Sequence, residues 1–144
     1  EQIEFLKPEY VFIDYLQLIN TSNRKNRSEE LETVVKELKN IAQKNKCIIF
    51  IASQLSRALE TRIDKRPLLS DLRGSGAIEN ISDIVIFIHR EEYYHYINEE
   101  EYAYNKGKAE IIVAKNNCGL TAITNLLFRA SIMKFLEPIT CDEF

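Results

Sequence analysis

Two polar residues directly follow apolar runs, and their types suit phosphate and metal chemistry. Asp14 follows the run Tyr10–Ile13, and Ser53-Gln54 follows the run Cys47–Ala52. In an open α/β sheet, ligands bind outside the carboxyl ends of the strands, so both residues would stand beside a ligand. A carboxylate there can hold Mg²⁺ through water. An amide there can hydrogen-bond a phosphate or the attacking water of a nucleotide hydrolase.

The same two residues also have plainer interpretations. An Asp at the end of a strand often caps the neighbouring loop through its own side chain. The amide of Gln54 can likewise serve only to pack and hydrogen-bond a loop. Position alone leaves the ligand-binding and the structural interpretation open for both residues.

The remaining reactive residue types form no recognisable catalytic pattern. The sequence contains no HExxH and no Ser or Cys nucleophile motif, and His89 and His95 show no partner spacing. Three cysteines lie far apart without a CxxC pair, so neither a zinc cage nor a disulfide framework is expected. Cys47 begins an apolar run, which predicts a core position.

A Tyr-rich stretch at residues 93–96 has two interpretations. Tyr93-Tyr94-His95-Tyr96 can form a platform on which bases stack. Alternatively, these amphipathic rings pack over a sheet edge, which is the interpretation we favour because such rings cover edges readily. His95 is then a surface residue.

The elements that must position these residues follow from the apolar pattern. Continuous apolar runs at residues 10–13, 47–52 and 84–88 predict strands that are buried on both faces, as in a parallel sheet. Between the first two runs, one apolar stripe predicts an amphipathic helix that ends near residues 44–46. The stripe consists of Leu31, Val34, Val35, Leu38, Ile41 and Ala42. Strand, helix and strand together predict a βαβ unit.

The second half of the chain has a different pattern. Residues 109–114 and 123–128 predict two further strands, and the short turn with Gly119 predicts a hairpin between them. Residues 53–83 form a long, locally basic connection with short helices expected near 55–60 and 77–81. Its basic residues are Arg57, Arg62, Lys65, Arg66 and Arg73. Long loops in compact α/β domains are usually functional.

Composition excludes several classes of protein. The 144 residues are 45% hydrophobic and 28% charged, so a wholly disordered chain is excluded. No apolar run approaches the roughly 20 residues that span a bilayer, and residues 1–4 do not begin a signal peptide. The net charge of −3 excludes a globally basic nucleic-acid binder but not a local basic loop. The cysteine content fits a reducing compartment.

Motifs in consecutive order resemble replicative hexameric DNA helicases of the DnaB type. Residues 11–19, VFIDYLQLI, resemble that family's Walker B strand. The family's next motif block resembles four segments of this chain, residues 53–57, 64–67, 69–73 and 75–76. The resemblance continues in residues 82–85 and 90–94. The family's late strand resembles residues 108–115. The resemblance covers nearly all of residues 10–128, and the order and spacing of the motifs make it specific.

The resemblance implies a RecA-like ATPase that uses ATP and Mg²⁺. Asp14 would help to hold Mg²⁺ through water at the β- and γ-phosphates, and Gln54 would sense the γ-phosphate and link it to the following loop. Lys115 matches the lysine that reaches the nucleotide of a neighbouring subunit.

The resemblance also implies a ring around single-stranded DNA. Arg73, Gly74 and Gly76 lie where the central-channel loop of the family grips the DNA backbone. An arginine supplies charge, and backbone N–H groups beside glycines can approach phosphate closely.

The chain departs from the family pattern at several places. It contains no GxxxxGK[ST] phosphate-binding loop, and the family's catalytic glutamate, which belongs upstream, is missing as well. Asn117 stands where the family has an arginine finger, a group worth about 10³–10⁵ in rate in phosphoryl transfer. Residues 119–122 read GLTA in place of GPTG, and Gly74 replaces a glutamate.

These observations lead to one set of expectations. The fold is α/β, a partial RecA-like P-loop NTPase core with a mostly parallel sheet and a C-terminal antiparallel hairpin. Residues 1–144 form the C-terminal portion of one helicase domain, with a core at 10–128, a surface excursion at 91–107 and a tail at 129–144.

The expected function is that of a replicative ring helicase, which couples ATP hydrolysis to translocation on single-stranded DNA and to unwinding. The alternative is a degenerate relative that keeps its DNA and subunit contacts without catalysis. The isolated chain is expected to be inactive. Expected partners are single-stranded DNA, the other subunits of a homo-hexamer, primase and a helicase loader, with no membrane, in a bacterial-type cytoplasm or an organelle stroma such as a plastid.

Overall fold

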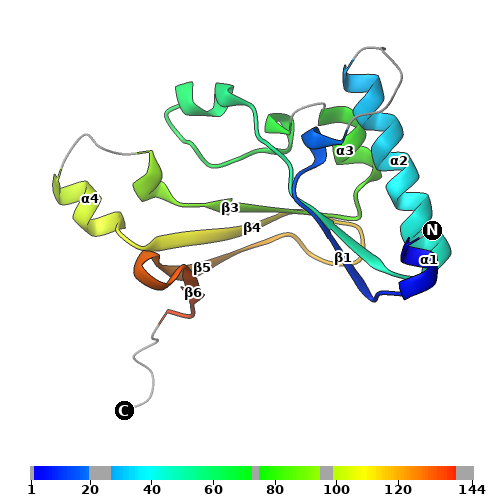
Figure 1. Cartoon of the computed structure of the whole chain (residues 1–144). Helices are drawn as coiled ribbons and strands as arrows, with labels where there is room; N and C mark the ends of the chain where they lie inside the picture. The colour runs from blue at the N-terminus through cyan, green and yellow to red at the C-terminus, as the bar shows by residue number, and fades with distance from the viewer. Residues whose placement is uncertain (1, 20–26, 73–74, 95–98, 139–144) are drawn as a thin grey trace. The chain divides into compact units, whose positions relative to one another are not determined.

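The computed structural model describes residues 2–19, 27–72, 75–94 and 99–138 (Figure 1). The chain divides into two compact units. Unit 1 comprises Glu1–Ser56 and Leu68–Ser82, and unit 2 comprises Arg57–Pro67 and Asp83–Phe144. Among the described residues, no helix is both long enough and apolar enough to cross a membrane.

Unit 1 contains the predicted strand–helix–strand arrangement. Strand β1 (Tyr10–Ile13) pairs in parallel with β2 (Ile48–Ile51), from Tyr10 opposite Ile48 to Ile13 opposite Ile51. Helix α2 (Arg27–Asn45) connects the two strands and contacts β2 and α3. Its buried residues Leu31, Val34 and Val35 belong to the predicted apolar stripe. The unit also contains α1 (Gln2–Leu6), η1 (Leu16–Leu18), η3 (Leu69–Asp71) and α3 (Ser75–Ile81).

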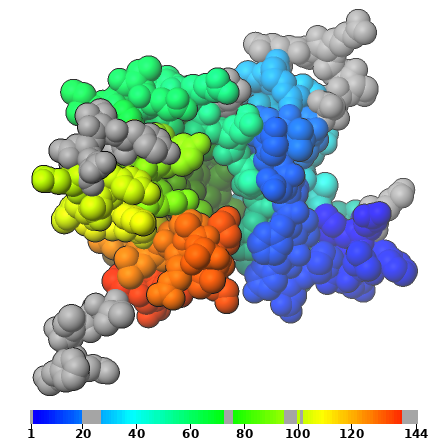
Figure 2. Space-filling model, turned by 60° about the vertical axis from the view of Figure 1, so that its left-hand side comes forward, coloured from blue at the N-terminus to red at the C-terminus, as the bar shows by residue number. Residues whose placement is uncertain are grey.

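Unit 2 is an antiparallel sheet of order β3–β4–β5–β6 (Figure 1). The strands are β3 (Ile84–His89), β4 (Lys108–Asn116), β5 (Ala122–Arg129) and β6 (Lys134–Leu136), and the short helices are η2 (Arg57–Thr61), η4 (Glu91–Tyr93), α4 (Glu99–Asn105) and η5 (Ala130–Ile132). Figure 2 shows β5 and β6 on the visible surface in orange to red, in keeping with the exposure of most of their side chains.

A glycine is required where the chain enters β4. Gly107 has a φ of 76°, a backbone conformation that disfavours any side chain. A Cβ atom there would lie 3.3 Å from the carbonyl oxygen of Phe128. Gly107 also donates its N–H to Glu92 Oε2 over 2.8 Å, and its carbonyl accepts the N–H of Phe128 over 2.6 Å.

The α/β class, the three early strands and the hairpin are confirmed, but the balance of strand pairing differs from the expectation. Among the described residues, β1–β2 is parallel, whereas β3–β4, β4–β5 and β5–β6 are antiparallel. Two of the three antiparallel pairs, β4–β5 and β5–β6, are joined by short connections, which cannot connect parallel strands. The tail contributes β6, which carries too short an apolar pattern to be predicted.

The strands are also less buried than their apolar runs predicted. Phe12 on β1 is 75% exposed and stacks at 5.0 Å on Phe50 of β2, which is 45% exposed. On β3, Val85 and Phe87 are buried while Ile86 is 52% exposed. Continuous apolar runs are buried on both faces only where further elements cover both faces of the sheet. Each of these strands therefore presents one apolar face to solvent in this structure.

Candidate functional site

The ends of β1 and β2 meet at one edge of unit 1. The N–H of Ala52 donates to the carbonyl of Ile13 over 2.9 Å, and the N–H of Leu16 donates to the carbonyl of Ala52 over 2.9 Å. Asp14 directly follows Ile13, and Ser53-Gln54 directly follows Ala52, so the structure brings both predicted positions to the same edge. The parallel register of the two strands produces this meeting, as the sequence predicted.

Gln17 ties these two strand ends together. Its side-chain amide donates from Nε2 to Ser53 Oγ over 3.0 Å, and its Oε1 accepts the N–H of Gln54 over 3.1 Å. One side chain of η1 thus fixes the backbone of Gln54. Asp14 and Gln54 themselves are exposed at this edge.

The donors at this edge suit a hydrated cation and an anionic ligand. An exposed carboxylate can hold Mg²⁺ through water, which Mg²⁺ keeps readily in its coordination shell. Among the described residues, no three His, Cys, Asp or Glu side chains cluster into a metal site. The site can therefore supply one carboxylate to Mg²⁺ but not a complete protein cage.

The chain following Gln54 is bound to the segment that leads into Arg73. Leu55 forms an antiparallel bridge with Leu72, and the N–H of Ser56 donates to the carbonyl of Asp71 over 2.7 Å. The segment that follows Gln54 is thus paired through its backbone with Asp71 and Leu72, the residues that precede Arg73 in the sequence. Arg73 and Gly74 lie outside the described residues.

Gly76 lies in α3 and is exposed. A Cβ atom built there would meet no atom within 4 Å. The local fold therefore does not require a glycine at this position, in contrast to Gly107. Because the fold does not require a glycine here, the absence of a side chain is consistent with a ligand that approaches the backbone closely.

Lys115 follows an irregularity in β4. Ile86 is opposite Val113 and Val85 is opposite Lys115, so Ala114 is an extra residue in the ladder. Such a bulge bends the strand and redirects the side chains beyond it, and bulges are common next to active sites. Lys115 is partly buried in this structure.

The predicted hairpin tip contains Asn117. Its N–H donates to the carbonyl of Asp83 over 2.9 Å, which anchors the tip to the start of β3. Asn116 Oδ1 accepts the N–H of Cys118 over 3.0 Å, and Asn116 Nδ2 donates to the carbonyl of Leu120 over 3.2 Å. Asn117 is exposed. No residue from 116 to 122 carries a positive charge, so the tip itself has no cation in place of the family's arginine.

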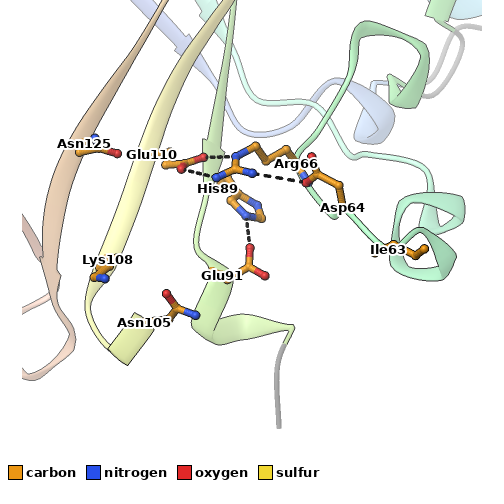
Figure 3. Close-up of a pocket in the computed structure, with 9 residues that line it drawn as sticks. All are labelled: Ile63, Asp64, Arg66, His89, Glu91, Asn105, Lys108, Glu110 and Asn125. Carbon is orange, nitrogen blue, oxygen red and sulfur yellow. Dashed lines mark hydrogen bonds and ion pairs between the residues drawn. The ribbon is translucent and has the colours of Figure 1, made fainter. Parts of the chain in front are cut away.

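Unit 2 holds a cavity of about 490 Å³ that is lined by paired charges (Figure 3). Arg66 donates from Nε and Nη2 to the two carboxylate oxygens of Glu110 over 2.7 and 2.8 Å. His89 Nε2 lies 2.7 Å from Glu91 Oε2. His89 is 2% exposed, and its Nδ1 has no hydrogen-bond partner among the described residues.

These pairings shift the ionisation of the acidic groups. The hydrogen bond from Arg66 holds the pKa of Glu110 below its usual value, although partial burial opposes the shift. The backbone N–H of Arg66 likewise lowers the pKa of Asp64. Burial raises the pKa of Glu92, but hydrogen bonds from Arg90 and from the N–H of Gly107 outweigh burial, so the net shift is downward. These carboxylates therefore form hydrogen bonds and ion pairs with neighbouring residues of the fold.

The Tyr-rich stretch is described up to Tyr94: Tyr94 packs on His89 at the end of β3, whereas Tyr93 is 68% exposed. The ring of Tyr94 stacks on His89 at 5.7 Å with an interplanar angle of 15°, and Tyr93 meets Tyr94 edge to face at 5.3 Å. Burial raises the pKa of the Tyr94 hydroxyl. His95 and Tyr96 lie outside the described residues. Cys47 is 8% exposed, which confirms its predicted core position.

Sequence analysis does not reveal four features described above: the hydrogen bonds of Gln17, those of Asp71, the bulge at Ala114 and the pairing of His89. Gln17 and Asp71 lie inside motifs that were recognised, but their roles depend on hydrogen bonds between segments distant in sequence. The Ala114 bulge depends on register, which no local pattern specifies. His89 was assigned no partner, although its separation from Glu91 by two residues was a usable signal.

The comparisons with known proteins agree on one family. Residues 4–137 match the DnaB-like helicase C-terminal domain. The chain belongs to this family. It is 44% identical over 126 residues to a probable plasmid replicative DNA helicase from Chlamydia psittaci, covering 87% of this chain and 26% of that protein. The chain thus spans about a quarter of the length of that relative.

Two solved structures are similar to this member of the DnaB-like family. One is a DnaB-like replicative helicase studied with its interactions with primase, with a TM-score of 0.83, 34% identity, and coverage of 95% of this chain and 32% of that chain. The other is the ATPase domain of a second protein, also with a TM-score of 0.83 and 34% identity, and with coverage of 95% of this chain and 48% of that chain. The expected relationship to a RecA-like helicase ATPase domain is thereby confirmed.

Proposed function

We propose that residues 1–144 are the C-terminal portion of the motor domain of a replicative ring helicase. The full-length protein would couple ATP hydrolysis to translocation on single-stranded DNA and to unwinding. The observation that carries this proposal is the meeting of the Asp14 and Gln54 strand ends, joined by the 2.9 Å bond from Ala52 N–H to the Ile13 carbonyl. Membership of the DnaB-like family supports it.

The edge of β1 and β2 would face the nucleotide. Asp14 would hold Mg²⁺ through water at the β- and γ-phosphates of ATP, and Gln54 would contact the γ-phosphate. Bound Mg²⁺ neutralises charge that develops on the phosphates. Lys115 would reach the nucleotide of a neighbouring subunit, which requires a ring of identical chains. A P-loop, absent from this sequence, would come from an upstream segment.

The loop that includes Arg73, Gly74 and Gly76 would hold the DNA backbone in the channel of the ring. Contacts with phosphates carry no sequence information, which suits a protein that moves along DNA. Primase and a helicase loader would be further partners, and the similarity to a helicase studied with primase supports the former. The protein would act in a bacterial-type cytoplasm or in an organelle stroma such as a plastid.

The test is ATP hydrolysis by the full-length protein with and without single-stranded DNA. We expect hydrolysis that DNA stimulates and that Asp14→Asn abolishes, while the 144-residue chain alone stays inactive. Ser70→Ala, at an exposed position of η3, serves as the matched control and should hydrolyse like the wild type. An assembled wild-type ring that binds ATP without hydrolysing it would contradict the enzymatic proposal.

Asn117 favours a second candidate, a ring that binds DNA and its neighbours without catalysis. The hairpin tip offers no cation where the family has an arginine. In this case Asn117→Arg should raise the ATPase rate by a large factor, up to about 10³-fold. Robust hydrolysis by the wild type that Asn117→Arg leaves unchanged would eliminate this candidate.

A further inference from the structure

A buried carboxylate, Asp71, lies in the segment that is bonded to the exit from β2 and that precedes Arg73 by two residues in the sequence. Asp71 is 5% exposed, and the proposed function assigns it no role. We propose that Asp71 is a positioning residue that transmits the nucleotide state from Gln54 to the DNA-binding loop. This inference rests on the proposed function and names a regulatory connection within the same site.

The Asp71 carboxylate fixes a turn. Its Oδ2 accepts the N–H of Leu68 over 2.8 Å, while the N–H of Asp71 donates to the carbonyl of Leu68 over 2.9 Å. These reciprocal bonds close η3. A buried carboxylate deprived of its donors carries a large desolvation cost, so the turn is held in one conformation.

The backbone of the same residue binds the exit from β2. The carbonyl of Asp71 accepts the N–H of Ser56 over 2.7 Å, and the neighbouring pair Leu55 and Leu72 forms a bridge. Asp71 therefore takes part in bonds to two segments, its side chain to the turn and its backbone to the strand exit.

The sequence places the two functional positions close to this link. Gln54 precedes Ser56 by two residues, and Arg73 follows Asp71 by two residues. Gln17 also binds the N–H of Gln54, so the sensor backbone is held from both sides. A shift of the Gln54 backbone on γ-phosphate binding would move residues 71 and 72 together, because the closed turn moves as one piece.

A positioning role and a merely structural role have different consequences. If Asp71 only shapes the DNA loop, its loss weakens DNA binding equally in every nucleotide state. If Asp71 transmits the nucleotide state, its loss removes the difference between the states. The ratio of DNA affinities measured with two nucleotides therefore separates the two roles.

The experiment measures the binding of a labelled single-stranded oligonucleotide to the full-length protein by fluorescence anisotropy. Each variant is measured with ADP and with a non-hydrolysable ATP analogue. Asp71→Ala should reduce the ratio of the two affinities to about one. Asp71→Asn keeps an oxygen that accepts the Leu68 N–H, and it should keep most of the ratio. Ser70→Ala, an exposed neighbour in the same turn, should keep all of it.

A second variant tests the link from its other side. Ser56→Pro removes the N–H that binds the Asp71 carbonyl and leaves the carboxylate in place. Ser56→Pro should also reduce the ratio of the two DNA affinities to about one. If Asp71→Ala does not fold, the result for Ser56→Pro tests the inference by itself. Hydrogen exchange in α2 reports whether each variant is folded.

Three results would overturn the inference. The first is a wild-type ratio in folded Asp71→Ala or Ser56→Pro. The second is an equal loss of DNA affinity in both nucleotide states. The third is a wild-type protein that binds neither nucleotide nor DNA, which would refute the proposed function itself and is therefore distinguishable from the first two.

Discussion

The cavity of unit 2 and the β1–β2 strand edge of unit 1 hold their polar groups in different ways. Around the unit 2 cavity, three carboxylates have structural partners: Glu110 pairs with Arg66, Glu91 with His89, and Glu92 with Arg90 and the N–H of Gly107. At the strand edge of unit 1, Asp14 and Gln54 are exposed, and the hydrogen bonds there fix their backbone neighbours instead. The comparison indicates that the paired carboxylates of unit 2 stabilise the fold, whereas the exposed side chains of Asp14 and Gln54 are available to a ligand.

The comparison predicts a large loss of ATPase activity when Lys115 of unit 2 is removed, because Lys115 is proposed to act on the nucleotide of a neighbouring subunit. Lys115→Ala should lower the ATPase rate of the full-length ring about 100-fold, because it removes a cation from the developing charge. Lys134→Ala, an exposed lysine of β6 in the same sheet, should leave the rate unchanged.

Mixed rings sharpen this test. Rings made only of Asp14→Asn subunits or only of Lys115→Ala subunits should have little or no activity, but mixed rings contain some sites in which both native residues meet. Mixing should therefore restore a fraction of the activity. Absence of restoration, in rings shown to contain both variants, would mean that the two residues do not act in one site.

Two glycines allow function and folding to be tested separately. Gly76 is proposed to serve DNA binding, whereas Gly107 is required by the fold. Gly76→Ala meets no neighbour, so the free energy of unfolding should not fall, whereas affinity for single-stranded DNA should fall on the order of 10-fold through loss of a close phosphate contact. Anisotropy titrations and urea unfolding measure the two quantities. A Gly76→Ala protein with native DNA affinity would remove Gly76 from the DNA interface.

Gly107→Ala should show the converse. The positive φ and the 3.3 Å approach to Phe128 predict a loss of about 1 kcal/mol or more in the free energy of unfolding. DNA affinity measured on the folded protein should be unchanged. Wild-type stability in this variant would show that the turn adapts to a side chain.

The smallest expected effect concerns the pairing of Glu110 with Arg66. Because the pKa of Glu110 is lowered in the folded state, its stabilisation is present above the pKa of the unfolded state, about 4.3, and is lost as pH falls through the folded-state pKa. Glu110→Gln should cost less than about 1 kcal/mol at pH 7, since Arg66 is 47% exposed.

Urea unfolding of the 144-residue chain at pH 7 and pH 3 measures this contribution. The difference in stability between the wild type and Glu110→Gln should be present at pH 7 and smaller at pH 3, where the carboxyl group becomes protonated. Glu37→Gln, an exposed position on α2, is the control. An equal difference at both pH values would show that the ionised carboxylate is not the stabilising form.

The sequence predicted local elements and the meeting of strand ends well, because both follow from short patterns. The apolar runs located β1, β2 and β3, and the stripe from Leu31 to Ala42 located α2. Parallel neighbours place their carboxyl ends at the same edge, so the sequence predicts that the strand ends followed by Asp14 and Gln54 meet.

The sequence could not predict features that depend on contacts between distant segments. The reach of Gln17 to Ser53, the bond from Ser56 to Asp71 and the extra residue Ala114 all arise from register and tertiary packing. Burial was overestimated for the same reason, since an apolar run does not specify which elements cover each face of its strand.

The central claim is that Asp14 stands beside a bound Mg²⁺–triphosphate. The most direct measurement is the affinity of the full-length protein for a non-hydrolysable ATP analogue, with and without Mg²⁺, in the wild type and in Asp14→Asn. We predict that Mg²⁺ strengthens binding to the wild type and that Asp14→Asn loses this gain while its Mg²⁺-free affinity is unchanged. The same gain from Mg²⁺ in both proteins would contradict the claim.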